Sequence, residues 1–285
     1  MRSVARPAIF WMLSLASLAL AKDQQLENQA KSFVVPFDLA SGFLVVITAK
    51  IGTIDGLKFI VDTGASHSGI DEALAVKLHL SRREGKINNF DKIFQVELAE
   101  VSELRLGELS LPSISVVVLN LAKYSELTTQ VDGVIGLDLL GRSKSFSIDY
   151  RRKLVLFRLP ADGTPHHEAF PCFVVPLSVQ GVSVKLVVDT GLQGILLYRH
   201  PLRTRLPNMQ VEGGITNISM GRLQLKKVSV PRVRIANLES VRTVYLLDDL
   251  QKRAIAGVDG FFGPSELHAQ ILEFDFDDGV LRWQE

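Results

Sequence analysis

The sequence repeats itself at an interval of 127 residues. Residues 59–64 read Phe-Ile-Val-Asp-Thr-Gly, and residues 186–191 read Leu-Val-Val-Asp-Thr-Gly. The triplet Val-Asp-Gly at 131–133 recurs at 258–260 in the same register. Residues 147–157 resemble residues 273–283 at an offset of 126. Three landmarks in one register predict a chain that folds as two related halves.

The apolar segments have the length and composition of β-strands. Most are short, rich in Val, Ile, Leu and Phe, and bounded by turn residues. This pattern predicts strands at 42–51, 57–62, 93–98, 113–119, 182–188 and 228–235. Helical spacing is limited to residues 71–78, which begin with an Asp of the N-cap type, and to residues 247–254. We therefore expect a mainly β chain with few, short helices.

A stretch of turn-forming residues at 159–168 separates the two repeats. We predict a first lobe at 33–158, a linker at 159–168 and a second lobe at 169–285. About ten linker residues span up to about 33–36 Å when extended, which allows the halves to pair within one chain. We expect a monomer; exchange of halves between two chains is the alternative.

The first 21 residues have the three parts of a signal peptide. Two arginines precede an uncharged stretch at 8–21, and small residues occupy positions 19 and 21. The uncharged stretch is shorter than the roughly 20 residues that a spanning helix needs. We expect cleavage before Lys22, export to the periplasm or the extracellular space, and no membrane association afterwards. Residues 22–32 are either a propeptide or a tether.

Charge and cysteine content exclude several other classes. Thirty-two basic and 31 acidic residues leave a net charge of +1 with no basic stripe, so we expect no nucleic-acid partner. The single cysteine, Cys172, has no partner for a disulfide or a Cys-based metal site and is expected to be a small buried residue. His166 and His167 are adjacent in the predicted linker and are expected to be solvated. We expect no metal and no cofactor.

Each repeat places an aspartate at the end of an apolar strand, followed by Thr-Gly. Two such loops can face each other across a pseudo-twofold axis and bring Asp62 and Asp189 within hydrogen-bond reach. Carboxyl groups so close share one proton. The ionised group can activate a water, and the protonated group can polarise a carbonyl. The alternative is a pair of solvated turn residues.

These motifs resemble those of a known family. The loop Val-Asp-Thr-Gly-Ala-Ser at 61–66, together with Val-Ile-Gly-Leu-Asp-Leu-Leu at 134–140, is similar to the paired motif of retropepsin-like aspartic proteases. Some bacterial exported members carry two such units in one chain, and the resemblance covers roughly residues 33–285. It implies an all-β acid-protease fold, with two pseudo-twofold-related, β-barrel-like lobes and a peptide cleft between them.

The resemblance also implies roles for individual residues. Asp62 and Asp189 would be the catalytic dyad, and the strand through Gly136 would pack behind the first loop. The residues that would support the dyad are Thr63, Gly64, Thr190 and Gly191. A hairpin covering the cleft is expected at 85–90 in the first half and at the glycine pair 213–214 in the second. The candidates for the cleft or its covering hairpins are Ala65, Ser66, Leu192, Gly213 and Gly214.

The second repeat departs from this pattern. Leu192-Gln193 follow its Asp-Thr-Gly, and the later glycine strand reads Gly-Phe-Phe-Gly-Pro at 260–264. Leu192 is expected to narrow the cleft. Neither Ala65 nor Leu192 carries a hydroxyl, so the dyad should ionise at higher pH than in pepsin and work at mildly acidic pH.

We expect an aspartic endopeptidase that acts on peptides or unfolded proteins. The alternative, motivated by Leu192 and residues 260–264, is a weak or inactive relative that binds extended peptides in the same cleft. Four further aspartates recur in the repeats and are expected to cap turns or anchor strand ends: Asp132, Asp149, Asp259 and Asp275. A serine-hydrolase site at Ser66 or Ser68 is not expected, because neighbouring residues do not readily form the required contact with His67.

Overall fold

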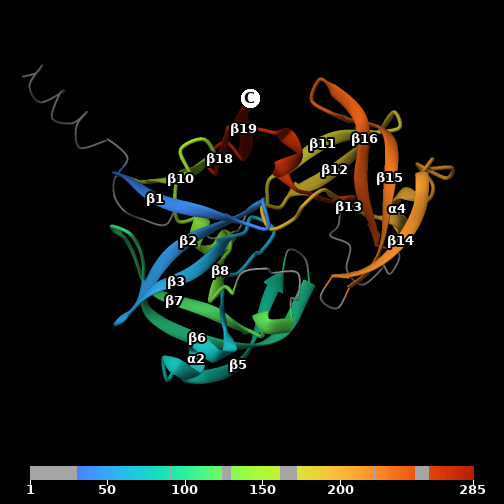
Figure 1. The fold of residues 1–285 in the computed structure, drawn as a ribbon. Coiled ribbons are helices and arrows are strands. Elements are labelled where there is room, and N and C mark those ends of the chain that lie inside the picture. Colours follow the sequence, from blue (N-terminus) through green and yellow to red (C-terminus); the bar gives the residue numbers. More distant parts are fainter. Residues whose placement is uncertain (1–30, 90–91, 124–129, 161–171, 221–222, 248–256) are drawn as a thin grey trace, which may run out of the picture.

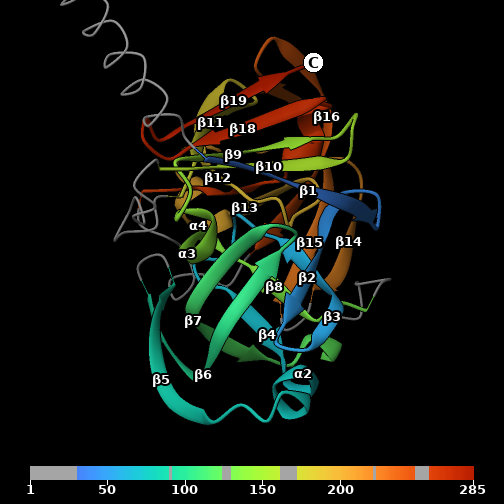
Figure 2. The ribbon, with the colours of Figure 1, turned by 90° about the vertical axis from the view of Figure 1, so that its left-hand side faces the viewer.

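The structure is a computed structural model that describes residues 31–285 except 90–91, 124–129, 161–171, 221–222 and 248–256. The fold is almost entirely β and forms two sheets (Figures 1 and 2). The larger has twelve strands in the order β19-β18-β9-β10-β1-β2-β3-β8-β4-β7-β6-β5. The smaller has seven, in the order β11-β12-β17-β13-β16-β15-β14.

The first half contains the elements up to β10. They are β1 (Lys31–Ala40), β2 (Leu44–Ile51), β3 (Ile54–Val61), β4 (Gly69–Asp71), α2 (Glu72–Lys77), β5 (Arg82–Asn89), β6 (Lys92–Leu106), β7 (Leu109–Leu119), the 3₁₀ helix η1 (Leu121–Lys123), β8 (Gly133–Ile135), α3 (Leu137–Leu140), β9 (Ser145–Asp149) and β10 (Leu154–Leu159).

The second half contains the elements from β11 onward. They are β11 (Val174–Val179), β12 (Val182–Val188), β13 (Ile195–Tyr198), α4 (Arg199–Leu202), β14 (Glu212–Met220), β15 (Leu223–Ile235), β16 (Leu238–Leu247), β17 (Gly260–Phe262), the 3₁₀ helix η2 (Pro264–Leu267), β18 (Ile271–Asp275) and β19 (Val280–Gln284). All six strands predicted from the apolar segments fall on strands of the structure.

The sequence repeat is also a repeat of strand pairing. β3 pairs in parallel with β8, with Phe59 opposite Gly133, and β12 pairs in parallel with β17, with Leu186 opposite Gly260. β4 and β13 run antiparallel to β8 and β17, respectively, and parallel to β7 and β16. Each half therefore builds the same arrangement around its Asp-Thr-Gly loop, and the all-β fold of two related lobes is confirmed.

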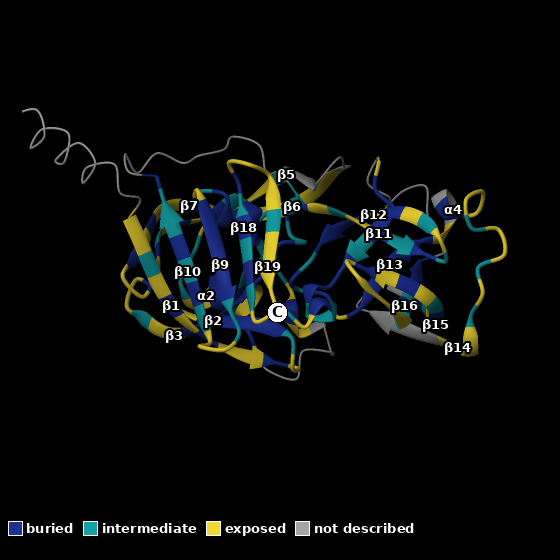
Figure 3. Cartoon of the chain, turned by 90° about the horizontal axis from the view of Figure 1, so that it is seen from above, coloured by how far each residue is buried: buried dark blue, intermediate teal, exposed yellow. Residues whose placement is uncertain are grey.

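A sheet that crosses from one half to the other joins the lobes. β18 pairs antiparallel with β9, so the last two strands extend the sheet of the first half. The rings of Phe146 and Phe274 stack there at 4.5 Å between centroids, and Phe173 meets Phe274 edge-on at 5.1 Å. Figure 3 shows β9 buried in the middle of this sheet and β19 exposed at its edge. Shared strands and a shared apolar core fix the two loops relative to each other.

The helices are short, as expected. Asp71 caps α2, because its side chain accepts a hydrogen bond of 2.9 Å from the Ala73 N–H, and this helix was predicted. α3 and α4 have four residues each, which is too short for a helical spacing to show in the sequence. None of the helices in the described ranges is long and apolar enough to span a membrane.

The hairpins near the positions predicted to cover a cleft are formed by β5 and β6 in the first lobe and by β14 and β15 in the second. Residues 85–89 of the hairpin expected at 85–90 lie at the end of β5, where Asn89 pairs with Lys92 of β6, and residue 90 lies outside the described ranges. The turn expected at Gly213-Gly214 is wrong, because these residues lie inside β14 and the strand reverses only after Met220. The two glycines lie instead at an irregularity of β14, where the pairing with β15 shifts between Glu212 and Thr216. Gly213 has φ +76° there, a backbone conformation that favours glycine.

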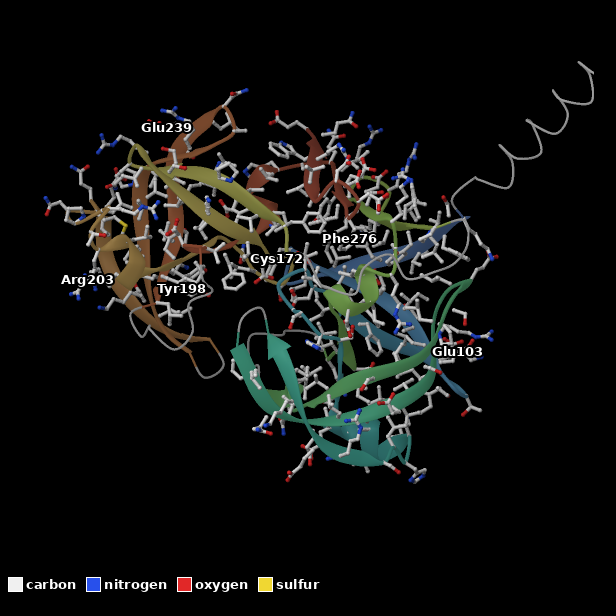
Figure 4. All side chains as sticks on the ribbon, turned by 180° about the vertical axis from the view of Figure 1, so that it is seen from behind. Glu103, Cys172, Tyr198, Arg203, Glu239 and Phe276 are labelled. Carbon is white, nitrogen blue, oxygen red and sulfur yellow. The ribbon has the colours of Figure 1, made fainter. Side chains whose placement is uncertain are left out.

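Several predictions fall on residues that the structure does not describe. These are the signal peptide at 1–21, most of the linker at 159–168, and all of the second predicted helix except Leu247, which ends β16. The lobe boundaries therefore stay predictions. Cys172 follows the linker and is half-buried against the apolar core, where burial raises the pKa of its thiol (Figure 4).

Candidate active site

The two Asp-Thr-Gly loops are tied to each other by their threonines. The backbone N–H of Thr63 donates to Oγ1 of Thr190 at 3.0 Å, and the N–H of Thr190 donates to Oγ1 of Thr63 at 3.1 Å. Each hydroxyl donates in turn to a carbonyl in the facing lobe, that of Val188 at 2.8 Å for Thr63 and that of Val61 at 2.7 Å for Thr190. Both threonines are buried, so these four bonds form without competition from water.

Gly64 and Gly191 follow these threonines and allow the backbone of each loop to lie close to the catalytic carboxyl group of the other loop. A Cβ on Gly64 would lie 2.3 Å from Cγ of Asp189, and a Cβ on Gly191 would lie 2.9 Å from Cγ of Asp62. Each glycine N–H also donates to Oδ1 of the aspartate in its own loop, at 2.8 Å in both lobes. Only glycine leaves room for this approach, which explains the residue in both copies.

Asp62 and Asp189 hydrogen-bond to each other through their side chains and are half-buried. Loss of hydration raises the pKa of both carboxyl groups. The rise is much larger for Asp189, because the negative charge of Asp62 adds to it and fewer backbone donors oppose it. The nearby backbone N–H groups of Gly64, Ala65 and Gly191 lower the pKa of Asp62 and offset part of the desolvation. Two carboxyl groups in such contact can share one proton.

The strand that passes behind each loop fixes the backbone of the aspartate. The Asp62 N–H donates to the carbonyl of Ile135 at 2.9 Å, and the Asp189 N–H donates to that of Phe262 at 2.9 Å. Gly136 lies directly under the first loop, since a Cβ there would come within 2.8 Å of the Ala65 carbonyl oxygen. This packing was predicted. Gly263, 127 residues later, lies in the same way against the Leu192 carbonyl, so the Phe-Phe-Gly-Pro sequence keeps the backbone arrangement of the first lobe.

Leu192 does not narrow a cleft with an exposed side chain, as the sequence suggested. Its side chain is 6% exposed and packs in an apolar cluster of the second lobe with Leu196, Tyr198, Leu225 and Leu247. The ring of Tyr198 meets that of Phe261 edge-on at 6.1 Å; Tyr198 is labelled in Figure 4. The apolar side chain of Leu192 is stabilised here because the second lobe buries it in this cluster.

The other candidates lie near the first loop. Ala65 is half-buried, whereas Ser66 is buried and its hydroxyl lies 2.9 Å from Nδ1 of His67. The expectation that these neighbours would not make contact is therefore wrong. Gly213 and Gly214 are exposed, in β14. Within the described ranges, no three His, Cys, Asp or Glu side chains gather as a potential metal site.

The recurring aspartates make structural hydrogen bonds. Asp132 Oδ2 accepts from the Lys58 N–H at 2.8 Å, and Asp259 Oδ2 accepts from the Lys185 N–H at 2.9 Å. Asp149 accepts from the Arg152 N–H at 2.8 Å in the turn after β9. Asp275 accepts from two N–H groups in the equivalent turn after β18. These contacts agree with the predicted roles in turns and strand ends.

The comparison with protein families agrees with this geometry. The aspartyl protease family model matches residues 46–139, which include Asp62 and Gly136. This first part of the chain therefore resembles aspartyl proteases. The match ends before the second repeat, so Asp189 is assigned by the internal duplication. Among curated protein sequences, none matches the chain.

Solved structures similar to this chain include a retropepsin-like aspartic protease from Rickettsia conorii. That protein has 19% identity and a TM-score of 0.33, and the match covers 46% of this chain and 94% of that one. Conglutin gamma from lupine seeds has 12% identity and a TM-score of 0.45 over 90% of this chain and 95% of its own. Basic 7S globulin from soybean has 11% identity and a TM-score of 0.45 over 90% and 96%.

One part of the candidate site was missed by sequence reasoning. Asp138 follows Gly136 by two residues, and its Oδ1 accepts from the N–H of Ser68 at 2.8 Å and from the Ser68 hydroxyl at 2.6 Å. The family motif at 134–140 contains this aspartate, but its partner lies 70 residues away in the chain. Only the fold brings the two together.

Proposed function

We propose that the chain is an aspartic endopeptidase that hydrolyses peptide bonds at an Asp62/Asp189 dyad. The observation that supports this most strongly is the reciprocal contact of the two loops. Threonine bonds and glycine approaches at matched positions bring two carboxyl groups into hydrogen-bond contact. The stability of the fold does not explain this arrangement, because removing two adjacent carboxyl groups from water costs free energy.

The environments of the two acids suggest different roles. Asp62, with its backbone donors, is the ionised group and takes a proton from an attacking water. Asp189 carries the shared proton and donates a hydrogen bond to the oxygen of the scissile carbonyl. As the water attacks, the proton of Asp189 passes to the carbonyl oxygen and a tetrahedral diol forms. When the C–N bond breaks, the amine takes the proton held by Asp62 and Asp189 takes a proton from a diol hydroxyl, so the two carboxyl groups again share one proton.

The alternative is a relative that binds extended peptides without cutting them. It was motivated by Leu192 and by the glycine strand of the second repeat. Leu192 is buried in its own lobe, and Gly263 holds the same place as Gly136. Neither feature disturbs the dyad, so both observations favour catalysis over binding alone.

The remaining parts of the proposal follow from the sequence. The substrates are peptides or unfolded proteins, and the protein acts as a monomer whose two lobes form one site. The signal-like residues at 1–21 direct it to the periplasm or the extracellular space.

The test is cleavage of a mixed peptide library by the mature protein across about pH 3–7, beside the isosteric variant Asp189→Asn. We expect cleavage by the wild type at mildly acidic pH, because burial raises the pKa of both carboxyl groups. The variant should lose orders of magnitude in kcat/KM while still binding peptides. Peptide binding without cleavage by the wild type would favour the alternative instead.

A further inference from the structure

The second lobe buries an ion pair that the proposed mechanism does not use. Arg242 of β16 donates through Nη1 to Oε2 of Glu266, in η2, at 3.0 Å. Both side chains are largely buried, at 13% and 19% exposed, whereas the Arg234–Glu239 pair of the same β-hairpin is 57% and 43% exposed. Removing one partner of a largely buried pair is costly, because the other charge then stays buried without compensation.

One end of this ion pair lies on the segment beneath the second catalytic loop, residues 189–194. The Glu266 N–H donates to the Gly263 carbonyl at 3.1 Å, and the Gly263 N–H donates to the carbonyl of Gly194, at the end of the loop, at 2.8 Å. Phe262, just before this glycine, accepts from the Asp189 N–H at 2.9 Å. The segment that carries Glu266 is therefore bound to the loop at both its ends.

The other end of the ion pair lies on the strand beside the same loop. β16 pairs in parallel with β13, and Val244, two residues after Arg242, lies opposite Ile195, the first residue after the loop. A Cβ on Gly194 would lie 3.2 Å from the ring of Tyr245, so β16 also packs against the end of the loop. The loop is thus held by β16 on one side and by the segment leading into η2 on the other, and the ion pair joins these two elements.

The first lobe holds its loop in a different way. The residues 127 positions before Arg242 and Glu266 are Ser115 and Leu139, and neither carries a charge. In that lobe Asp138 of α3 binds the loop itself. The ion pair is therefore not part of the arrangement that the two repeats share.

We propose that Arg242 and Glu266 are positioning residues: their ion pair fixes η2 against β16 and so holds the second loop where Asp189 meets Asp62. The inference rests on the proposed function for its meaning in catalysis, where a displacement of about 1 Å in a reacting group can cost about a hundredfold in rate. Loss of the ion pair frees η2 from β16 and weakens the backbone bonds of the second loop, while the bonds of the first loop stay as they are.

The experiment is native-state hydrogen exchange of the full mature protein, followed by NMR. The reporters are the N–H groups of Asp189 and Gly263, which are bound in the second loop and beneath it. The reference is the Asp62 N–H, which makes the corresponding bond in the first lobe, to the Ile135 carbonyl at 2.9 Å. Local opening of the second loop speeds exchange at the reporters alone, whereas a loss of global stability also speeds exchange at the reference.

Three variants separate the ion pair from other effects. Glu266→Ala removes the acceptor, and Glu266→Gln keeps an oxygen acceptor without the charge. Glu239→Ala is the matched control, because it breaks the exposed pair with Arg234 on the same hairpin; Glu239 lies at the outer end of the second lobe (Figure 4). Both kcat and KM for peptide cleavage are recorded for the same proteins under conditions in which all are folded.

We expect exchange at Asp189 and Gly263 to be about tenfold faster in Glu266→Ala and about threefold faster in Glu266→Gln, as for losing or weakening one charge-assisted hydrogen bond. Exchange at Asp62 should stay as in the wild type, and Glu239→Ala should change none of the three. The kcat of Glu266→Ala should fall by about tenfold with KM unchanged, and Glu266→Gln should recover part of the loss.

Unchanged exchange at Asp189 in both Glu266 variants overturns the inference. An equal acceleration at Asp62 also overturns it, because the ion pair would then support only the global stability of the fold. If Glu266→Ala does not fold, the comparison of Glu266→Gln with the wild type decides. If the wild type cuts no peptide, the proposed function fails, but hydrogen exchange still decides whether the ion pair holds the second loop.

Discussion

Replacement of Thr63 by valine tests whether the threonine bonds between the lobes hold the site together. Valine has nearly the same shape, so the change removes the hydroxyl with little loss of volume. The Val188 carbonyl then loses its donor and the Thr190 N–H loses its acceptor, both in a buried interface. A buried polar group without its partner costs about 1–3 kcal/mol. The two together predict a loss of about 2–6 kcal/mol in the free energy of unfolding.

The matched control is Thr63→Ser, which keeps the hydroxyl and removes one methyl group, at a cost of about 1 kcal/mol. Urea denaturation of both variants gives the two free energies, with the slope checked for two-state unfolding. The reciprocal variant Thr190→Val should lose a similar amount, because its bonds mirror those of Thr63. Equal stability of Thr63→Val and Thr63→Ser would show that the hydroxyl bonds contribute nothing, and would refute the reasoning.

Three further changes have definite expected results. Asp189→Asn should stabilise the protein at pH 7 but not near about pH 3. Because the pKa of Asp189 is raised, the native wild type keeps a proton that the unfolded chain releases. The free energy of unfolding of the wild type therefore falls as pH rises, by about 1.4 kcal/mol for each pH unit between the titration midpoints of Asp189 in the unfolded and native states. A wild-type stability that rises over this range relative to the variant would contradict the assignment. Gly64→Ala should abolish peptide cleavage, since its Cβ would meet the Asp189 carboxyl group, whereas Gly214→Ala has open space and should retain activity. Leu192→Ala should lose about 2–5 kcal/mol of stability in denaturant unfolding, and Leu238→Ala, which is 54% exposed, should lose little.

The sequence predicted the parts of the fold that repeat. Two copies of Asp-Thr-Gly at one spacing, each after an apolar strand, were sufficient to predict related β lobes with facing loops. The N-cap of α2 was also predictable, because Asp71 directly precedes the helix and its effect is local. Features of this kind can be predicted because they depend only on neighbouring residues or on an exact sequence repeat.

The parts that the sequence did not reveal depend on long-range packing. Gly213-Gly214 looked like a turn, but glycines also accompany strand irregularities, and only the pairing with β15 distinguishes the two. Leu192 looked like an obstacle beside the dyad, because the cluster that buries it comes from residues up to 55 positions away. The bond between Ser68 and Asp138 spans 70 residues and has no counterpart in the second repeat. The duplication therefore could not point to it.

The central claim is that Asp62 and Asp189 of one chain form one catalytic site. The most direct measurement is peptide cleavage by Asp62→Asn alone, by Asp189→Asn alone, and by the two variants mixed in equal amounts after joint refolding. We predict that the wild type cuts and that each variant and the mixture stay at background, since neither variant holds a complete dyad. Substantial activity in either single variant would contradict the shared-proton dyad, and activity restored in the mixture would show that the site forms between two chains.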